Sequence, residues 1–138
     1  MSDLHCAATL LLARAAGDRA VTLADSLADA RLALVYCSGT DGARLTAGTV
    51  AERLGVAVRV RDGLDGPADG ERAAAGWLRA ELQGIVDEHR GETVLVVGDV
   101  LADAVPQLVD NPRRYRDAPA AGQVAEVAAD ADGWVRRR

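Results

Sequence analysis

The sequence contains no phenylalanine, no lysine and only one methionine among its 138 residues. Hydrophobic residues still make up 49% of the chain, which is enough for a core, but that core must be built mainly from alanine, valine and leucine. No apolar run approaches the ~20 residues that a membrane-spanning helix needs. The N-terminal segment places an acid and a histidine before a short apolar run, unlike a signal peptide. We therefore expect one cytoplasmic domain over residues 1–138 that contacts no membrane.

Charge and cysteine content exclude further classes of protein. The formal net charge is −5, so the chain is a poor general binder of nucleic acid. All the basic residues are arginine, and the last three, 136–138, are expected to form a basic, solvated C-terminal tail. Two cysteines, Cys6 and Cys37, in a cytosolic setting predict free thiols. The sequence has no CxxC pattern, Walker loop or GxGxxG motif, and we expect no metal and no cofactor.

Strand and helix patterns alternate along the chain. Continuous apolar runs predict strands buried on both faces at 7–14, 32–38 and 93–98, and alternating valine and arginine predict a half-exposed edge strand at 56–64. Apolar residues at helical spacing predict helices at 21–31, 41–55, 71–91 and 100–109, and a closing hairpin follows at 124–136. This order predicts a single three-layer α/β/α domain with a mostly parallel central sheet.

Ligands of such folds bind at the carboxyl ends of the strands. Three strand ends therefore matter, at 14–17, 37–41 and 98–100. The first follows "TLLLARAA", the second lies in "VYCSGTDGARLTAGTVAERLGV", and the third closes "GETVLVVGDV".

These three blocks resemble the histidine phosphatases of the phosphoglycerate-mutase-like superfamily. In that family the first strand ends in Arg-His-Gly, and the second ends in Ser-Ser-Pro before a helix with Arg-Ala and Thr-Ala pairs. A later strand ends in Ser-His-Gly. The middle block of this chain matches closely, at Ser38, Ala43, Thr46, Ala47 and the Leu54-Gly55 pair. The resemblance implies the same fold, with substrate loops that are shorter than usual.

The catalytic positions of the family are not matched. Its chemistry needs a histidine nucleophile, two arginines and a second histidine around the phosphate. Ala15 stands at the nucleophile position, Gly42 at the second arginine and Asp99 at the second histidine. A carboxylate there would repel a phosphate dianion by roughly 4 kcal/mol at contact and a dielectric near 20. The resemblance therefore implies a pseudoenzyme.

We expect the degenerate pocket to serve as a binding module for a protein partner or a small anionic or polar ligand. Its expected lining is Arg14, Ala15, Ser38, Thr40, Gly42, Glu71 and Asp99. Glu71 stands where the family often has a leaving-group acid, although a glutamate in the first turn of a helix is also favoured by the helix dipole. Arg14 and Asp99 are expected to face one another and form an internal ion pair.

Asp99 has two other interpretations that the sequence leaves open. It could cap the N-terminus of the helix that follows, or pair with Asp103, four residues on, to bind a hard cation. An enzyme with altered chemistry could also use Asp99 and Glu71 as acid and base, and a residual phosphatase activity is a further alternative.

Three remaining features have simpler interpretations. "CSGTDGAR" has one residue too many between Cys37 and Arg44 for a tyrosine-phosphatase loop, so Cys37 is expected to be a buried small side chain. His89, at the end of a helix, is expected to be a solvated cap. A homo-oligomer would be indicated by an exposed apolar patch near Trp77 or Trp134.

Overall fold

The computed structural model describes residues 6–65, 74–113 and 117–138. The strands of its one sheet are β1 (Ala8–Ala13), β2 (Leu34–Cys37), β3 (Val58–Val60), β4 (Thr93–Val97), β5 (Ala125–Asp130) and β6 (Gly133–Arg136). The helices are α1 (Ala20–Ser26), α2 (Asp41–Leu54), α3 (Ala74–Glu88) and α4 (Asp99–Leu108), with 3₁₀ turns at Gly17–Arg19 (η2) and Asp62–Asp65 (η3). Glu71 lies outside the described residues.

The sheet has the strand order β3-β2-β4-β1-β5-β6. Strands β3, β2, β4 and β1 are parallel, whereas β5 runs antiparallel to β1 and β6 antiparallel to β5. Strands β1, β2 and β4 are buried on both faces, which is why their sequences are continuous apolar runs instead of alternating ones. The predicted α/β/α architecture with a mostly parallel sheet is confirmed.

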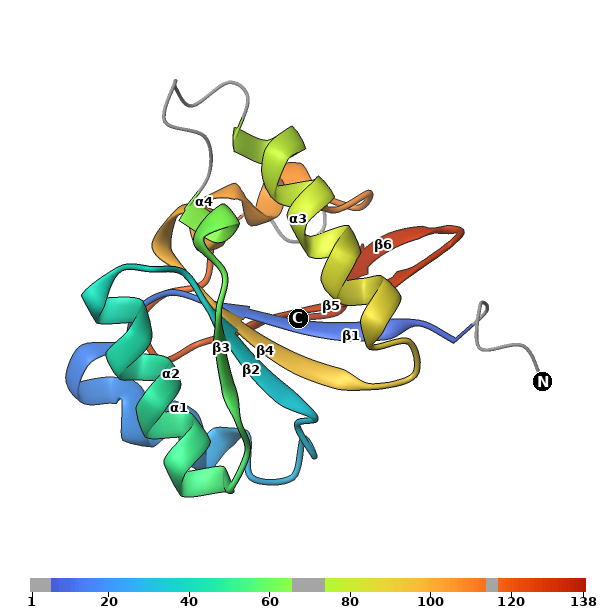
Figure 1. The fold of residues 1–138 in the computed structure, drawn as a ribbon. Helices are drawn as coiled ribbons and strands as arrows, with labels where there is room; N and C mark the ends of the chain where they lie inside the picture. Colours follow the sequence, from blue (N-terminus) through green and yellow to red (C-terminus); the bar gives the residue numbers. More distant parts are fainter. Residues whose placement is uncertain (1–5, 66–73, 114–116) are drawn as a thin grey trace.

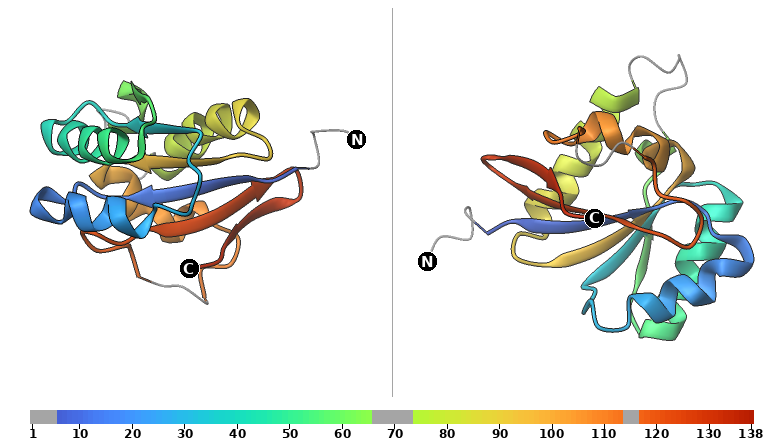
Figure 2. Two further views of the ribbon diagram at one scale, coloured as in Figure 1. Left: turned by 90° about the horizontal axis from the view of Figure 1, so that it is seen from below. Right: turned by 180° about the vertical axis from the view of Figure 1, so that it is seen from behind.

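Helices cover both faces of the sheet (Figure 1; Figure 2). Helices α1 and α2 lie on one face, over inward-facing residues that include Leu11, Val35 and Leu95. Helices α3 and α4 lie on the other, over residues that include Leu10 and Val96. Because successive strand residues point to opposite faces, β1, β2 and β4 each contribute to both cores. Aliphatic side chains make up most of both layers, and Tyr36 and Trp134 are also buried in the layer beneath α3 and α4.

Several predicted boundaries were too long. Helix α1 ends at Ser26 instead of Arg31, and β3 covers only Val58–Val60 of the predicted edge strand 56–64. Helix α2 ends at Leu54 and is followed by the cap residue Gly55, where φ is +69° and glycine is favoured. No helix in the described ranges is both long and apolar enough to cross a membrane.

The structure defines the environments of four side chains that the sequence singled out. Trp77 has the helical spacing of a core residue of α3, but it is 47% exposed and its Nε1 donates to the Gly63 carbonyl oxygen. Trp134 is fully buried beneath the Arg79 guanidinium, so it forms no exposed patch. The prediction of a solvated tail is wrong for Arg136, which is 7% exposed and donates to the Asp117 carbonyl oxygen. The predicted solvated cap, His89, is mostly buried against Tyr36.

The outer edge of β6 is closed by two consecutive residues. Asp110 donates its backbone N–H to the Trp134 carbonyl oxygen, and its carboxylate accepts the Trp134 N–H. The Asn111 amide does the same for Arg136, accepting its N–H through Oδ1 and donating to its carbonyl oxygen through Nδ2. All four outward-facing backbone groups of these two strand residues are therefore paired.

Candidate functional site

The carboxyl ends of β1, β2 and β4 lie side by side, because these strands are parallel neighbours in the sheet. Arg14 and Ala15 directly follow β1, Ser38 follows β2, and Gly98 and Asp99 follow β4. The backbone N–H of Ser38 donates to the Val97 carbonyl oxygen at 2.9 Å, and that of Gly98 donates to the Ala13 carbonyl oxygen at 2.8 Å. These residues at the ends of β1, β2 and β4 thus form one continuous surface, which we call the strand-end rim.

Ala15 and Gly42 are neighbours across this rim. A Cβ atom placed on Gly42 would lie 3.2 Å from the Ala15 Cβ. These are the two positions at which the family resemblance expects a nucleophile and a second arginine. The structure therefore places Ala15 and Gly42 next to one another, as the resemblance requires, and neither residue has a side chain that could react or bind phosphate.

Asp99 is the first residue of α4, and its carboxylate points back toward β1. Its Oδ1 accepts the backbone N–H of Ala15 at 2.9 Å. The predicted N-cap role is wrong, because the cap residue is Gly98 and no side chain caps this helix. Asp99 instead fixes the backbone at the position where the family has its nucleophile.

Arg14 does not pair with Asp99, and that expected ion pair is wrong. Its Nη2 donates to Asp103 Oδ1 at 2.6 Å, and its Nε donates to the Pro119 carbonyl oxygen at 2.6 Å. The Arg14 side chain is 26% exposed and that of Asp103 is 68% exposed. The spacing of four residues between Asp99 and Asp103 puts both carboxylates on the same side of α4. A cation bound between the two carboxylates was one of the interpretations that the sequence left open, but Asp103 pairs with Arg14.

Hydroxyl groups hold the two loops beside this rim. Thr46 of α2 accepts the Ala16 N–H at 2.9 Å, and both residues are buried. Thr40 caps α2 by accepting the Ala43 N–H, and its Oγ1 lies 3.3 Å from the Ser38 Oγ. Ser38 is 1% exposed, so its hydroxyl serves this local contact more than an open cleft.

The loop between β2 and α2 is also fixed by a carboxylate. Asp65 of η3 accepts the Gly39 N–H at 3.1 Å. A side chain at Gly39 would collide with Asp62, since a Cβ there would lie 2.8 Å from Asp62 Oδ1. Sequence reasoning missed Thr46, Asp65 and Pro119 as site residues, because their contacts join elements far apart in the chain.

Two alternative chemistries lose support from this geometry. Cys37 is fully buried, and that burial raises the pKa of its thiol above its usual value, with Asp65 adding to the rise and Arg44 opposing it. A thiolate nucleophile is therefore disfavoured. Within the described ranges no three His, Cys, Asp or Glu side chains are grouped closely enough to hold a metal ion, and Asp103 is engaged by Arg14.

Comparisons with solved structures were made for the whole chain. YhfR of Bacillus stearothermophilus is 19% identical, with a TM-score of 0.73 and 94% of each chain covered. Phosphoglycerate mutase from Bacillus anthracis is 15% identical, with a TM-score of 0.76, covering 99% of this chain and 94% of that one. The alpha-ribazole phosphatase from Shigella flexneri is 16% identical, with a TM-score of 0.72 and 94% of each chain covered.

No family model matches the sequence, and no curated protein matches it. The similarity that these comparisons show therefore lies in the arrangement of the helices and strands. The chain therefore shares the fold of these solved structures, which include a phosphoglycerate mutase and an alpha-ribazole phosphatase.

Proposed function

We propose that this protein is a pseudoenzyme that uses the strand-end rim as a binding module and does not transfer phosphoryl groups. The proposal rests on one observation: polar groups at the strand-end rim are already bound by other groups of the same chain. Asp99 accepts the Ala15 N–H, and Asp103 and the Pro119 carbonyl oxygen accept hydrogen bonds from the Arg14 guanidinium. The proteins of similar fold include a phosphoglycerate mutase and an alpha-ribazole phosphatase, so the proposal is a loss of the chemistry that those names describe.

The missing groups support the same conclusion. A phosphoryl transfer needs a nucleophile and a positive surrounding for the phosphate oxygens. Ala15 offers a methyl group, Gly42 has no side chain, and Asp99 brings negative charge to the same place. A phosphate dianion entering the rim would meet this carboxylate before it could reach the backbone N–H.

Binding, in contrast, remains chemically possible at Arg14. Its Nη1 has no partner among the described residues, and its ion pair is with a mostly exposed carboxylate. Exposed pairs of this kind contribute at most about 1 kcal/mol. A polar or anionic group of a ligand or partner protein can therefore displace Asp103 at little cost, while Ala15 stays held by Asp99.

Two measurements test the proposal. We expect no turnover of an aryl phosphate above that of buffer, and no heat of binding with inorganic phosphate. A double variant, Asp99→Asn and Asp103→Asn, is expected to bind inorganic phosphate, since the Ala15 N–H and the Arg14 guanidinium lose their competing anions.

The matched control is Asp25→Asn with Asp87→Asn, which removes two exposed carboxylates elsewhere, those paired with Arg53 and Arg90. This variant has the same net charge as the double variant but should not bind phosphate. Turnover by the unmodified protein that disappears on Arg14→Ala would overturn the pseudoenzyme assignment.

A further inference from the structure

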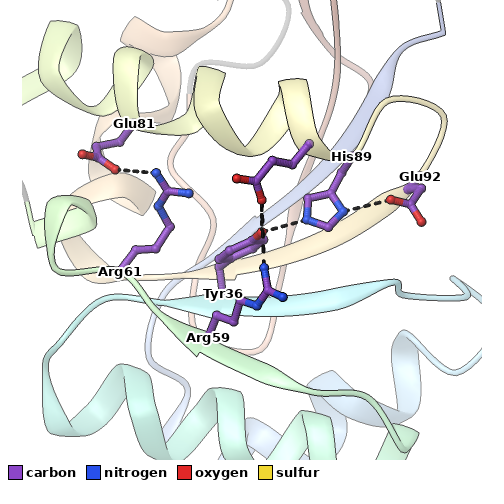
Figure 3. A network of polar contacts seen from close by, with 7 residues as sticks. Tyr36, Arg59, Arg61, Glu81, His89 and Glu92 are labelled. Carbon is purple, nitrogen blue, oxygen red and sulfur yellow. Dashed lines mark hydrogen bonds and ion pairs between the residues drawn. The ribbon is translucent and has the colours of Figure 1, made fainter. Parts of the chain in front are cut away.

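A second polar cluster lies between α3 and the sheet, away from the strand-end rim. Figure 3 shows Tyr36 of β2 beneath the last turn of α3, with His89 and Glu92 to one side and Arg59 of β3 below. The Tyr36 Oη lies 2.7 Å from His89 Nε2 and 3.3 Å from Glu88 Oε2. His89 Nδ1 lies 2.9 Å from Glu92 Oε1. The sequence analysis assigned no role to Tyr36 and treated His89 as solvated.

The cluster is buried at its centre and charged at its margin. Tyr36 is 1% exposed and the His89 side chain is 12% exposed, whereas the side chains of Glu88, Glu92 and Arg59 are each more than half exposed. Buried polar groups are costly unless they are hydrogen-bonded. The buried hydroxyl and imidazole must therefore keep partners in whichever protonation state His89 adopts.

The neutral state has one satisfactory arrangement. The Glu92 carboxylate can only accept, so the proton of neutral His89 lies on Nδ1 and is donated to Glu92. Nε2 then carries a lone pair, and the Tyr36 hydroxyl donates to it. Glu88 is left to Arg59, whose Nη1 lies 4.0 Å from its Oε2.

When His89 is protonated, the hydrogen bond between His89 Nε2 and the Tyr36 hydroxyl must run in the opposite direction. Both ring nitrogens of an imidazolium are donors, so Nε2–H donates to the Tyr36 Oη and the hydroxyl proton must find another acceptor. Glu88 Oε2 is already within reach at 3.3 Å. Burial and Glu88 raise the pKa of the Tyr36 hydroxyl, and the nearby Arg59 guanidinium opposes them.

We propose that the Tyr36 hydroxyl acts as a proton-dependent switch, donating to His89 when the imidazole is neutral and to Glu88 when it is protonated. The charged groups that face the cluster are Glu88 from α3, Glu92 from the turn before β4, and Arg59 from β3. Arg61 lies over the Tyr36 ring at 5.9 Å but is paired with Glu81. Protonation thus strengthens the hydrogen bond from Tyr36 to the Glu88 oxygen that also faces Arg59.

The test is a pH titration by NMR between pH 5 and 8, the range in which imidazoles titrate. The chain has two histidines and two tyrosines, so His5→Gln and Tyr115→Phe assign the signals. We expect the chemical shift of the Tyr36 ring carbon that bears the hydroxyl to change with pH. Its midpoint should equal that of the His89 ring nitrogens. A Tyr36 signal that stays constant through the His89 titration overturns the switch.

Variants of Glu88 separate hydrogen bonding from charge. Glu88→Ala removes the acceptor, so the His89 midpoint is expected to move to lower pH by about half a pH unit or more. Glu88→Gln removes the charge but keeps an acceptor oxygen, and should move it less. Asp87→Ala is the matched control, because Asp87 is equally exposed on the same turn and pairs with Arg90. Equal midpoints in Glu88→Ala and Asp87→Ala would refute the proposal.

Discussion

The hydrogen bond between Thr46 and Ala16 gives a sharp test of how the strand-end rim is held. Thr46 is 1% exposed and Ala16 is 4% exposed, and the hydroxyl accepts the backbone N–H at 2.9 Å. Thr46→Val keeps the shape of the side chain and replaces the hydroxyl with a methyl group. The Ala16 N–H then has no acceptor in a place that water does not reach.

The expected loss follows from the cost of an unsatisfied buried donor, which is about 1–3 kcal/mol. A loss of about 2 kcal/mol lowers the midpoint of urea unfolding by about 1 M, if the m-value is about 2 kcal/mol/M. The m-value itself should not change, because the variant exposes the same surface when it unfolds.

Thr49→Val is the matched control in the same helix. The Thr49 hydroxyl donates to the Leu45 carbonyl oxygen, and the site is open to solvent. Its removal leaves no buried group without a partner, so we expect a change within about 0.5 kcal/mol. Equal losses in the two variants would refute the reasoning, since they would show that burial of the Ala16 N–H carries no cost.

Three further predictions concern other parts of the chain. Gly55→Ala should lower the free energy of unfolding by about 1 kcal/mol because φ at Gly55 is +69°. Gly48→Ala, inside α2 with open space around it, should raise the free energy of unfolding by about 0.5–1 kcal/mol. Urea titrations in which both variants change stability with the same sign would contradict this. Asp103→Asn should change stability by less than about 1 kcal/mol, as differential scanning calorimetry can check, because the ion pair with Arg14 is exposed. An aromatic disulfide reagent at pH 8 should label Cys6 in the native protein and leave Cys37 unlabelled until the chain unfolds. Because the pKa of Cys37 is raised in the fold, the unfolded thiol loses its proton first, and stability should fall as the pH rises above about 8.5; a Cys37→Ala variant should lack this component, and an unchanged pH slope would argue against it.

The sequence predicted the layers of the fold because its signals are local. Apolar runs such as Val94–Val97 mark buried strands, and Gly55 marks the end of a helix. The predictions failed where a long-range contact decides the outcome. Trp77 fits a core stripe by spacing, yet its indole N–H is drawn outward to the Gly63 carbonyl oxygen, and Arg136 is buried because residue 117 offers it a carbonyl oxygen.

The candidate site was predicted in position but not in its contacts. Parallel strand ends must meet, so the grouping of Ala15, Gly42 and Asp99 follows from topology and the motif spacing. The pairing of Arg14 does not follow, because Asp99 and Asp103 lie on the same side of α4 and both could reach it. Only the direction of the helix after Gly98 decides between the two carboxylates. With the observed direction, Asp99 accepts the Ala15 N–H and Asp103 accepts a hydrogen bond from the Arg14 guanidinium.

The closed edge at β6 determines how this sheet can grow. Asp110 and Asn111 offer Trp134 and Arg136 the same donors and acceptors that a seventh strand would, so an extended peptide has no row of free groups there to join. At the opposite edge, β3 is three residues long, and Val58 and Val60 point their backbone groups away from β2. Addition of a strand from another chain is therefore directed to the short β3 edge, and the C-terminal hairpin is protected from aggregation.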